Sequence, residues 1–220
     1  MANKKAALIL LILFVTIVIN AQAVRDADGN VYSTVTMGKQ VWMGENLMTT
    51  KFNDGSDIPF ITGDKEWKAL KSPGYCWLNN DRSYKEVYGG LYNWYAVKTK
   101  KLCPKGWHVP SDAEWNVLAA FLGGEENAGN LLKEEGDEHW KNSLTICYNQ
   151  YGFTALPGGM RLSSGTFPTF ANSYCVWWTS DGDTKLKLAW NRGLFFSSNR
   201  MYKGNEGMSS GFSVRCLMDR

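Results

Sequence analysis

The sequence predicts a compact α+β domain with small antiparallel sheets, one or two helices and long loops. Short β-prone segments recur between glycine-containing turns in both the N-terminal and the C-terminal parts of the chain. One strongly marked helix begins at Ser111, near the middle. Ten tryptophans, ten tyrosines and 22 glycines against only six prolines are typical of a loop-rich fold held by large aromatic side chains.

The N-terminal residues indicate export. Two lysines precede an apolar run from Ala6 to Val15, and the small residues of Ala21-Gln-Ala follow, as at a signal peptidase site. The alternative is a membrane anchor, but the run is shorter than the roughly 20 apolar residues that span a bilayer. We therefore expect a signal peptide at residues 1–23 and a single domain at residues 24–220. The mature protein would be secreted, at the cell surface or in the periplasm, with no transmembrane segment.

The charge of the mature chain argues against nucleic-acid partners. The first 23 residues hold two of the 24 basic residues and none of the 21 acidic ones, which leaves 24 − 2 = 22 basic residues against 21 acidic. A nucleic-acid binder normally carries a basic stripe, and no such stripe or polybasic segment is visible. We expect a carbohydrate or a protein as partner, and the sequence leaves the oligomeric state open.

Five cysteines in an exported chain indicate disulfide bonds, because the secretory route is oxidising. The chain has no CxxC motif and no cysteine-histidine cluster of the kind that binds metal. We expect Cys103 to pair with Cys216. Cys76, Cys147 and Cys175 then remain, and Cys147 with Cys175 is the preferred second pair because both lie in short aromatic segments that resemble neighbouring strands.

A turn and a hairpin open the mature chain. Asp26 to Asn30 is rich in aspartate, and the segment from Val31 to Met43 alternates on both sides of a Gly38-Lys39 turn, which predicts a β-hairpin. The Asp-x-Asp-x-Asn spacing also suggests a calcium loop. An EF-hand loop requires glutamate at its twelfth position, where this chain has Met37, so we favour a plain turn.

The segment from Lys51 to Arg82 mixes turn residues with scattered aromatic residues. It predicts irregular surface chain with one short helix around Trp67. The next segment, YGGLYNWYAV from Tyr88, contains four aromatic residues and predicts a buried strand or turn. Exposed rings could stack on sugars, but packing is the commoner role of such residues.

The clearest helix follows Pro110. Ser111 and Glu114 form a capping-box pattern, so Glu114 is interpreted as a capping residue and not as a general acid. The apolar face consists of residues at helical spacing: Trp115, Leu118, Ala119 and Leu122. Two glycines from Gly123 end the helix. A second short helix is expected from Glu125 to Glu135.

From Leu144 onward, short strands and glycine turns predict a small antiparallel sheet. The loops between them, 180–184 and 191–211, are polar without apolar periodicity, which suits an exposed binding surface. The candidate ligand-binding residues are Trp178, Asp181, Asn191, Arg192, Asn199 and Tyr202.

Six motifs in this order carry a family resemblance: VWMGENL, YGGLYNWYAV, LCPKGWHVPSDAEW, GFTALPGG, VWWTS and GFSVRC. Together they resemble the Fibrobacter succinogenes major paralogous domain of exported bacterial proteins, over nearly all of the mature chain. That family is more remotely similar to the C-type lectin-like and formylglycine-generating-enzyme fold. The resemblance implies an exported or surface domain and does not imply an enzyme.

The chain departs from these remote relatives at their functional positions. Calcium-dependent lectins share a Trp-Asn-Asp strand, and this chain reads Trp190-Asn191-Arg192. Formylglycine-generating enzymes use a close pair of C-terminal cysteines, and Cys216 is the only cysteine in the last forty residues. We therefore expect neither calcium-mediated sugar binding nor copper-dependent oxidation, and we expect no metal and no cofactor.

Catalytic apparatus is also missing from the sequence pattern. The two histidines, His108 and His139, accompany no recognisable serine or cysteine nucleophile motif. We expect a non-enzymatic binding or cell-surface domain whose C-terminal loops meet a carbohydrate or a protein. The alternative is a structural or assembly module of the bacterial envelope with no small ligand.

Overall fold

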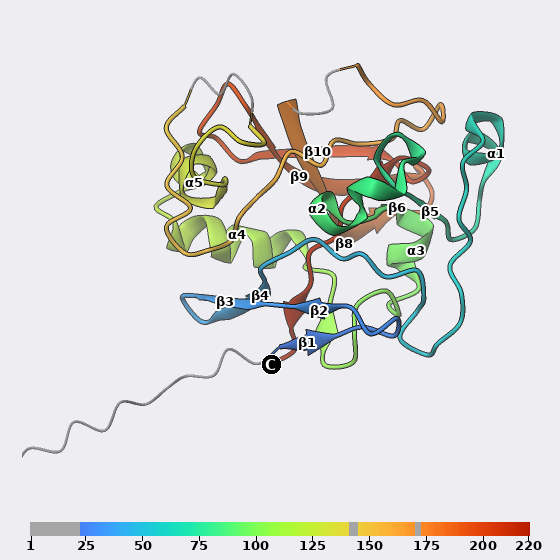
Figure 1. Cartoon of the computed structure of the whole chain (residues 1–220), viewed down its shortest axis with the longest axis horizontal. Coiled ribbons are helices and arrows are strands. Elements are labelled where there is room, and N and C mark those ends of the chain that lie inside the picture. The colour runs from blue at the N-terminus through green and yellow to red at the C-terminus, as the bar shows by residue number, and fades with distance from the viewer. Residues whose placement is uncertain (1–22, 141–144, 170–172) are drawn as a thin grey trace, which may run out of the picture.

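The computed structural model of the chain describes residues 23–140, 145–169 and 173–220. Within these ranges, four small antiparallel sheets and five short helices are joined by long loops (Figure 1). The α+β class predicted from the sequence is therefore confirmed. The expected signal peptide falls on residues that lie almost wholly outside the described ranges. None of the helices in the described ranges is long and apolar enough to cross a membrane.

The N-terminal turn and hairpin form as predicted. Strand β1 (Val24–Arg25) pairs with β2 (Val31–Tyr32), and β3 (Thr34–Met37) pairs with β4 (Gln40–Met43). The Asp26 side chain closes the first turn by accepting hydrogen bonds from the backbone N–H groups two and four residues later. Such bonds explain why aspartate is favoured in this type of turn.

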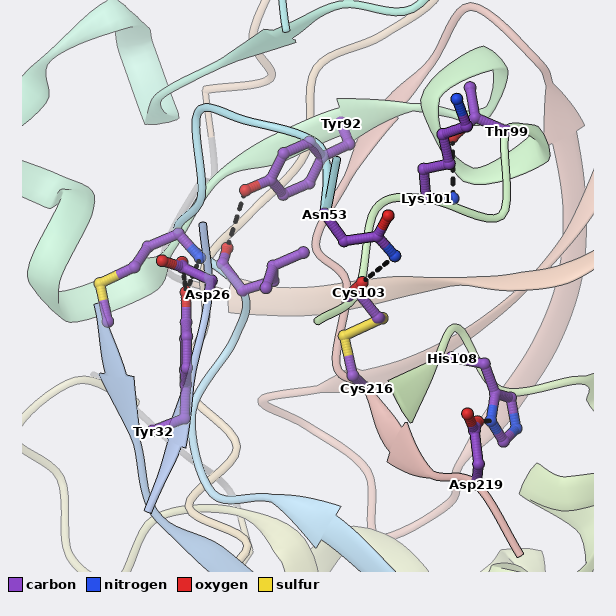
Figure 2. The surroundings of a disulfide bond; sticks show 12 residues. Asp26, Tyr32, Asn53, Tyr92, Thr99, Lys101, Cys103, His108, Cys216 and Asp219 are labelled. Atoms are coloured by element: carbon purple, nitrogen blue, oxygen red, sulfur yellow. Dashed lines mark hydrogen bonds and ion pairs between the residues drawn. A yellow bond between two sulfur atoms is a disulfide. The ribbon is translucent and has the colours of Figure 1, made fainter. Parts of the chain in front are cut away.

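A disulfide joins the middle of the chain to its C-terminal strand. Strand β12 (Leu217–Met218) lies between β4 and β7 (Trp107–His108), which gives the strand order β3-β4-β12-β7. Cys216 precedes β12, and Cys103 lies just ahead of β7. The two cysteines are bonded, with Cα atoms 6.0 Å apart (Figure 2). The predicted Cys103–Cys216 pair is confirmed.

A third sheet holds the segment around YGGLYNWYAV. Its strand order is β11-β6-β5, and short helical turns connect β5 to β6. The elements are β5 (Tyr75–Cys76), η1 (Leu78–Asn80), η2 (Arg82–Tyr84), α2 (Lys85–Tyr88), β6 (Leu91–Asn93), α3 (Trp94–Lys98) and β11 (Gly211–Phe212). Three of the four aromatic side chains in YGGLYNWYAV are buried, as predicted. The short helix expected around Trp67 is α1 (Asp64–Ala69).

Helices α4 (Asp112–Phe121) and α5 (Glu125–Leu132) follow the sequence pattern. The capping box is present: Ser111 Oγ accepts from the Glu114 N–H at 3.3 Å, and the Glu114 carboxylate accepts from the Ser111 N–H at 2.8 Å. The glycine pair between the helices has φ angles of 85° and 107°, which favour glycine. Helix α5 ends three residues earlier than expected.

The C-terminal region contains more strand than the sequence predicted. Strands β8 (Tyr174–Asp183), β9 (Leu188–Phe195) and β10 (Tyr202–Gly207) form one antiparallel sheet in the order β10-β9-β8. Most of the two expected loops, 180–184 and 191–211, therefore belongs to strands. Four consecutive residues of β9 from Asn191 are buried and β10 is an exposed edge, so neither shows the alternation that marks a half-buried strand.

The expected second disulfide is absent. Cys76, Cys147 and Cys175 are buried free thiols. Cys175 lies in β8, but Cys147 lies in irregular chain and not in a neighbouring strand. The prediction required two adjacent strands, and only one of them forms.

Candidate functional site

A polar and aromatic cavity of about 480 Å³ lies in the N-terminal half of the fold. Three other cavities in the described chain measure about 230, 160 and 120 Å³. We call the largest of these four the aromatic pocket. Its lining residues are Asp28, Asn30, Thr50, Phe60, Tyr75, Trp77, Asn80, Arg82 and Lys85.

Three aromatic rings form one wall of the pocket. The centroid of the Tyr75 ring lies 5.3 Å from that of Phe60 and 5.1 Å from that of Trp77. Tyr75 and Trp77 are almost fully buried, whereas Phe60 is 45% exposed. Strand pairing fixes the wall, because Tyr75 pairs with Tyr92 of β6 and makes a parallel bridge with Phe60. The wall thus combines two fixed rings with one accessible ring.

A hydrogen-bond network around Asp26 holds Asn30, another residue of the lining. The Asp26 carboxylate accepts from Asn30 Nδ2 at 2.7 Å. It also accepts from the Tyr32 hydroxyl at 2.6 Å (Figure 2). Burial and the nearby Asp26 carboxylate raise the pKa of Tyr32, so this hydroxyl keeps its proton and donates. The amide oxygen of Asn30 in turn accepts from Lys85 Nζ at 2.9 Å. Both ends of the Asn30 side chain are therefore held.

The Asp28 carboxylate is engaged by the backbone around residue 50. Its Oδ2 accepts from the Thr50 N–H at 2.5 Å and from the Thr49 hydroxyl at 3.3 Å. Its Oδ1 lies 3.9 Å from Lys51 Nζ. Asp28 thus links the first turn of the domain to Thr49 and Thr50.

Four polar groups that line the pocket have no partner among the described residues. The Tyr75 hydroxyl, the Trp77 indole N–H and the Arg82 guanidinium make no hydrogen bond or ion pair within that part of the chain. The fourth is Asn80 Oδ1, which is buried without a partner while Nδ2 donates to the Thr62 carbonyl at 3.0 Å. Only Asn80 Oδ1 among these groups is fully buried, and Arg82 is exposed. Buried polar atoms are nearly always hydrogen-bonded, so the orphaned Asn80 oxygen beside one cavity indicates a binding site.

The backbone that carries Asn80 has an unusual conformation. Asn79 and Asn80 have φ angles of 52° and 58°, in the left-handed region that asparagine tolerates better than most residues. Hydrogen bonds to the Trp77 and Leu78 carbonyls hold this turn. Backbone conformations of this kind often occur at binding sites, where the surrounding structure maintains them.

Charges of both signs act on the pocket. Burial raises the pKa of the Tyr75 hydroxyl, and the Asp28 carboxylate raises it further. The Arg82 guanidinium opposes this increase by stabilising the ionised phenol. Asp28 and Arg82 are therefore both within electrostatic reach of the Tyr75 ring.

Two of the predicted ligand-binding residues are fully buried, which corrects the sequence-based assignment. Trp178 has no exposed surface, donates its indole N–H to the Tyr92 carbonyl at 2.8 Å and stacks on Phe212 at 4.2 Å. Arg192 has no exposed surface and lies against helix α4, with ion pairs to Asp112 and Glu125. Both side chains stabilise the fold and cannot contact a ligand in this conformation.

The other four predicted residues do not share one cavity. Asp181 accepts a hydrogen bond from the first N–H of α4 at 2.6 Å, and Asn191 is buried in β9. The Asn199 carbonyl accepts from the N–H of Gly129 in α5 at 2.6 Å. Tyr202 is exposed, with its ring 4.8 Å from that of Phe195. None of the four lines the aromatic pocket.

Sequence reasoning missed the aromatic pocket because most of its lining comes from a segment interpreted as irregular surface chain. One local pattern could have indicated it. Tyr75 and Trp77 are two residues apart in extended chain, which favours one common face, and the polar residues 79–82 follow after Leu78.

Both histidines make contacts with acidic residues. His108 Nδ1 lies 2.6 Å from Asp219 Oδ1, and His108 Nε2 lies 3.0 Å from Glu114 Oε1 (Figure 2 shows the Asp219 contact). His139 Nδ1 lies 2.8 Å from Glu134 Oε2. One carboxylate oxygen each from Glu134 and Glu138 and one ring nitrogen of His139 lie within 4.8 Å of one another. The Glu114 contacts agree with its predicted capping role.

Comparison with known proteins gives one match. The sequence model of the family described as the Fibrobacter succinogenes major domain matches residues 35–218. No curated protein and no solved structure matches the chain. The remote similarity to the C-type lectin-like fold therefore stays a prediction.

Proposed function

The chain belongs to the Fibrobacter succinogenes major domain family, and we propose that it is an exported, non-enzymatic domain whose aromatic pocket binds a carbohydrate. The family description names no activity, so the proposal rests on the pocket. The observation that carries it is the buried, unpartnered Asn80 Oδ1 in a cavity that also holds the exposed Phe60 ring.

The chemistry of this lining suits a sugar. A sugar ring has apolar C–H faces and a rim of hydroxyl groups that donate and accept hydrogen bonds. The Phe60 ring offers an apolar surface, while the Tyr75 hydroxyl, the Trp77 N–H and the Asn80 amide oxygen offer both donors and acceptors. The volume of about 480 Å³ falls in the range of small-ligand sites, and the mostly polar lining suits a ligand rich in hydroxyl groups.

The number of carboxyl groups in the pocket favours binding of a sugar over hydrolysis of a glycosidic bond. Most glycoside hydrolases place two carboxyl groups on opposite sides of the bond that they cleave. Asp28 is the single carboxylate in the lining, and both of its oxygen atoms already have partners. This arrangement supports a binding role.

Export is supported by two features of the chain. The first 23 residues have the pattern of a signal peptide. The Cys103–Cys216 disulfide suits an oxidising compartment. The domain would act as a secreted, cell-surface or periplasmic protein.

The test is isothermal titration of the exported protein with cello-, xylo-, manno- and galacturono-oligosaccharides. We expect saturable binding to at least one of them, weakened about tenfold or more in Phe60→Ala, because one aromatic contact carries a large share of such an interface. The matched control is Phe121→Ala, which removes a ring of similar exposure (41% against 45%) from helix α4, outside the pocket. The control should bind as the unmodified protein does.

Two results would count against this proposal. One is the absence of binding to every oligosaccharide, and the other is an equal effect of the two phenylalanine substitutions. Either result would favour an envelope structural or assembly module, for which cross-linking of the exported protein on intact cells should capture protein neighbours.

A further inference from the structure

The charged groups of the aromatic pocket are unequally engaged. The lining holds two cationic residues, Arg82 and Lys85, and one anionic residue, Asp28. The Asp28 carboxylate is occupied by the Thr50 N–H and lies near Lys51. Positive charge therefore exceeds negative charge in the lining.

Only one of the two cations is free to bind a ligand. Lys85 Nζ donates to Asn30 at 2.9 Å and lies 3.3 Å from the Glu86 carboxylate. The Arg82 side chain is exposed at the pocket and makes no hydrogen bond and no ion pair with any residue in the described ranges, so water solvates it in the free protein. It is the one charged group of the lining without a counter-charge in contact.

The backbone next to Arg82 is held in place. Arg82 begins the short helix η2, and the Asp81 side chain caps that helix by accepting from the Ser83 N–H at 2.9 Å. The preceding turn is the left-handed pair Asn79 and Asn80. The guanidinium therefore extends from a fixed backbone position on the same stretch of chain as the Trp77 ring.

Building on the proposed carbohydrate function, we propose that the aromatic pocket selects acidic sugars, and that Arg82 binds the carboxylate of a uronic acid residue. The planar guanidinium presents pairs of N–H donors that match the two oxygens of a carboxylate. A sugar ring placed against Phe60 would direct its hydroxyl groups to Tyr75 and Asn80. The carboxylate would then supply the counter-charge that Arg82 lacks.

The experiment compares two ligands of the same length and linkage, one with carboxylates and one with neutral alcohols in their place. The first probe is an α-1,4-linked tetramer of galacturonic acid, and the second is the same tetramer with its carboxyl groups reduced to alcohols. Both are titrated into the unmodified protein, Arg82→Gln and Arg82→Lys. The matched control is Arg220→Gln, which removes an exposed arginine outside the pocket.

We expect the acidic tetramer to bind at least tenfold more tightly than the reduced one, because charge-assisted pairs are stronger than neutral hydrogen bonds. Arg82→Gln should remove most of that preference and leave binding of the reduced tetramer within about twofold. Arg82→Lys should give an intermediate loss, since lysine keeps the charge but not the paired donors. Added salt should weaken binding of the acidic tetramer more than binding of the reduced one.

Three results would overturn the inference. Equal affinity for both tetramers would show that the pocket does not select acidic sugars, although it binds carbohydrate. An equal loss of affinity for both tetramers in Arg82→Gln would show the same. Tighter binding of a sulfated oligosaccharide of the same charge would show that the carboxylate is not what is recognised. Failure of every neutral and acidic probe would instead reject the carbohydrate site itself.

Discussion

The guanidinium of Arg192 lies 2.6 Å from the Asp112 carboxylate and thereby joins strand β9 to the first turn of helix α4. A second guanidinium nitrogen lies 2.6 Å from Glu125, the first residue of α5. Acidic side chains are favoured at helix N-termini, where the helix dipole is positive. One buried cation thus connects the starts of two helices to the C-terminal sheet.

Loss of Arg192 should destabilise the fold strongly. We expect Arg192→Ala to lower the free energy of unfolding by about 3 kcal/mol or more, because it leaves partly buried carboxylates without their partner. Urea unfolding followed by tryptophan fluorescence measures the change. Arg220→Ala, which removes an exposed arginine, is the control and should stay within about 0.5 kcal/mol of the unmodified protein. An equal effect of the two substitutions would contradict a central role for Arg192.

Removal of the disulfide should also be costly. Its cysteines are separated by 113 residues, and the chain-entropy description gives about 4.7 kcal/mol for a loop of roughly this length. We expect the double substitution Cys103→Ser and Cys216→Ser to lose most of that stability in urea unfolding. A reducing agent should lower the stability of the unmodified protein, because it cleaves the disulfide. It should leave the stability of the double variant unchanged. Equal sensitivity of both proteins to reductant would rule out this bond as the cause.

The buried thiols should resist alkylation in the folded protein. Burial raises the pKa of Cys76 to about 12 and that of Cys175 to about 12. The thiolate is the reactive form, so iodoacetamide at pH 8 should leave both residues unmodified until urea is added. Peptide mass spectrometry measures the labelling, and the reaction in urea is the positive control. Rapid labelling of Cys175 without denaturant would show that β8 opens readily.

Stability should fall at acidic pH, partly through Glu114. Burial tends to raise the pKa of Glu114, but hydrogen bonds from Ser111 and His108 outweigh it and hold the pKa below its usual range. Glu114 therefore adds stability above its unfolded pKa of about 4.3, and that contribution disappears as the pH falls through the lower folded value.

The measurement compares urea unfolding of the unmodified protein and Glu114→Gln between pH 7 and pH 2. We expect the variant to be less stable at pH 7 and the difference to shrink below about pH 4. A difference that stays constant down to pH 2 would show that ionisation of Glu114 does not contribute.

Local patterns predicted the elements that local interactions determine. The capping box at Ser111 and the hairpin of β3 and β4 depend on residues close in sequence, and both form as expected. The long-range disulfide was also predicted, because its two cysteines lie in the matched motifs LCPKGWHVPSDAEW and GFSVRC. The second pair, Cys147 with Cys175, failed because it required a strand whose existence depends on tertiary packing.

The candidate site was not predictable in the same way. Arg192 was predicted to bind a ligand because it resembles an exposed charged residue in the sequence. Its partners Asp112 and Glu125, which bury it, lie 80 and 67 residues away. The aromatic pocket combines a turn near Asp28 with side chains up to Lys85. Its unpartnered groups become recognisable only when these segments are placed together.

The position of β12 has a consequence for how the protein matures. This strand lies between β4 and β7, both of which are synthesised long before it. The four strands can therefore join only after the segment around Leu217 has been made. The same segment carries Cys216, so neither the four-stranded sheet nor the Cys103–Cys216 bond can form before it is present.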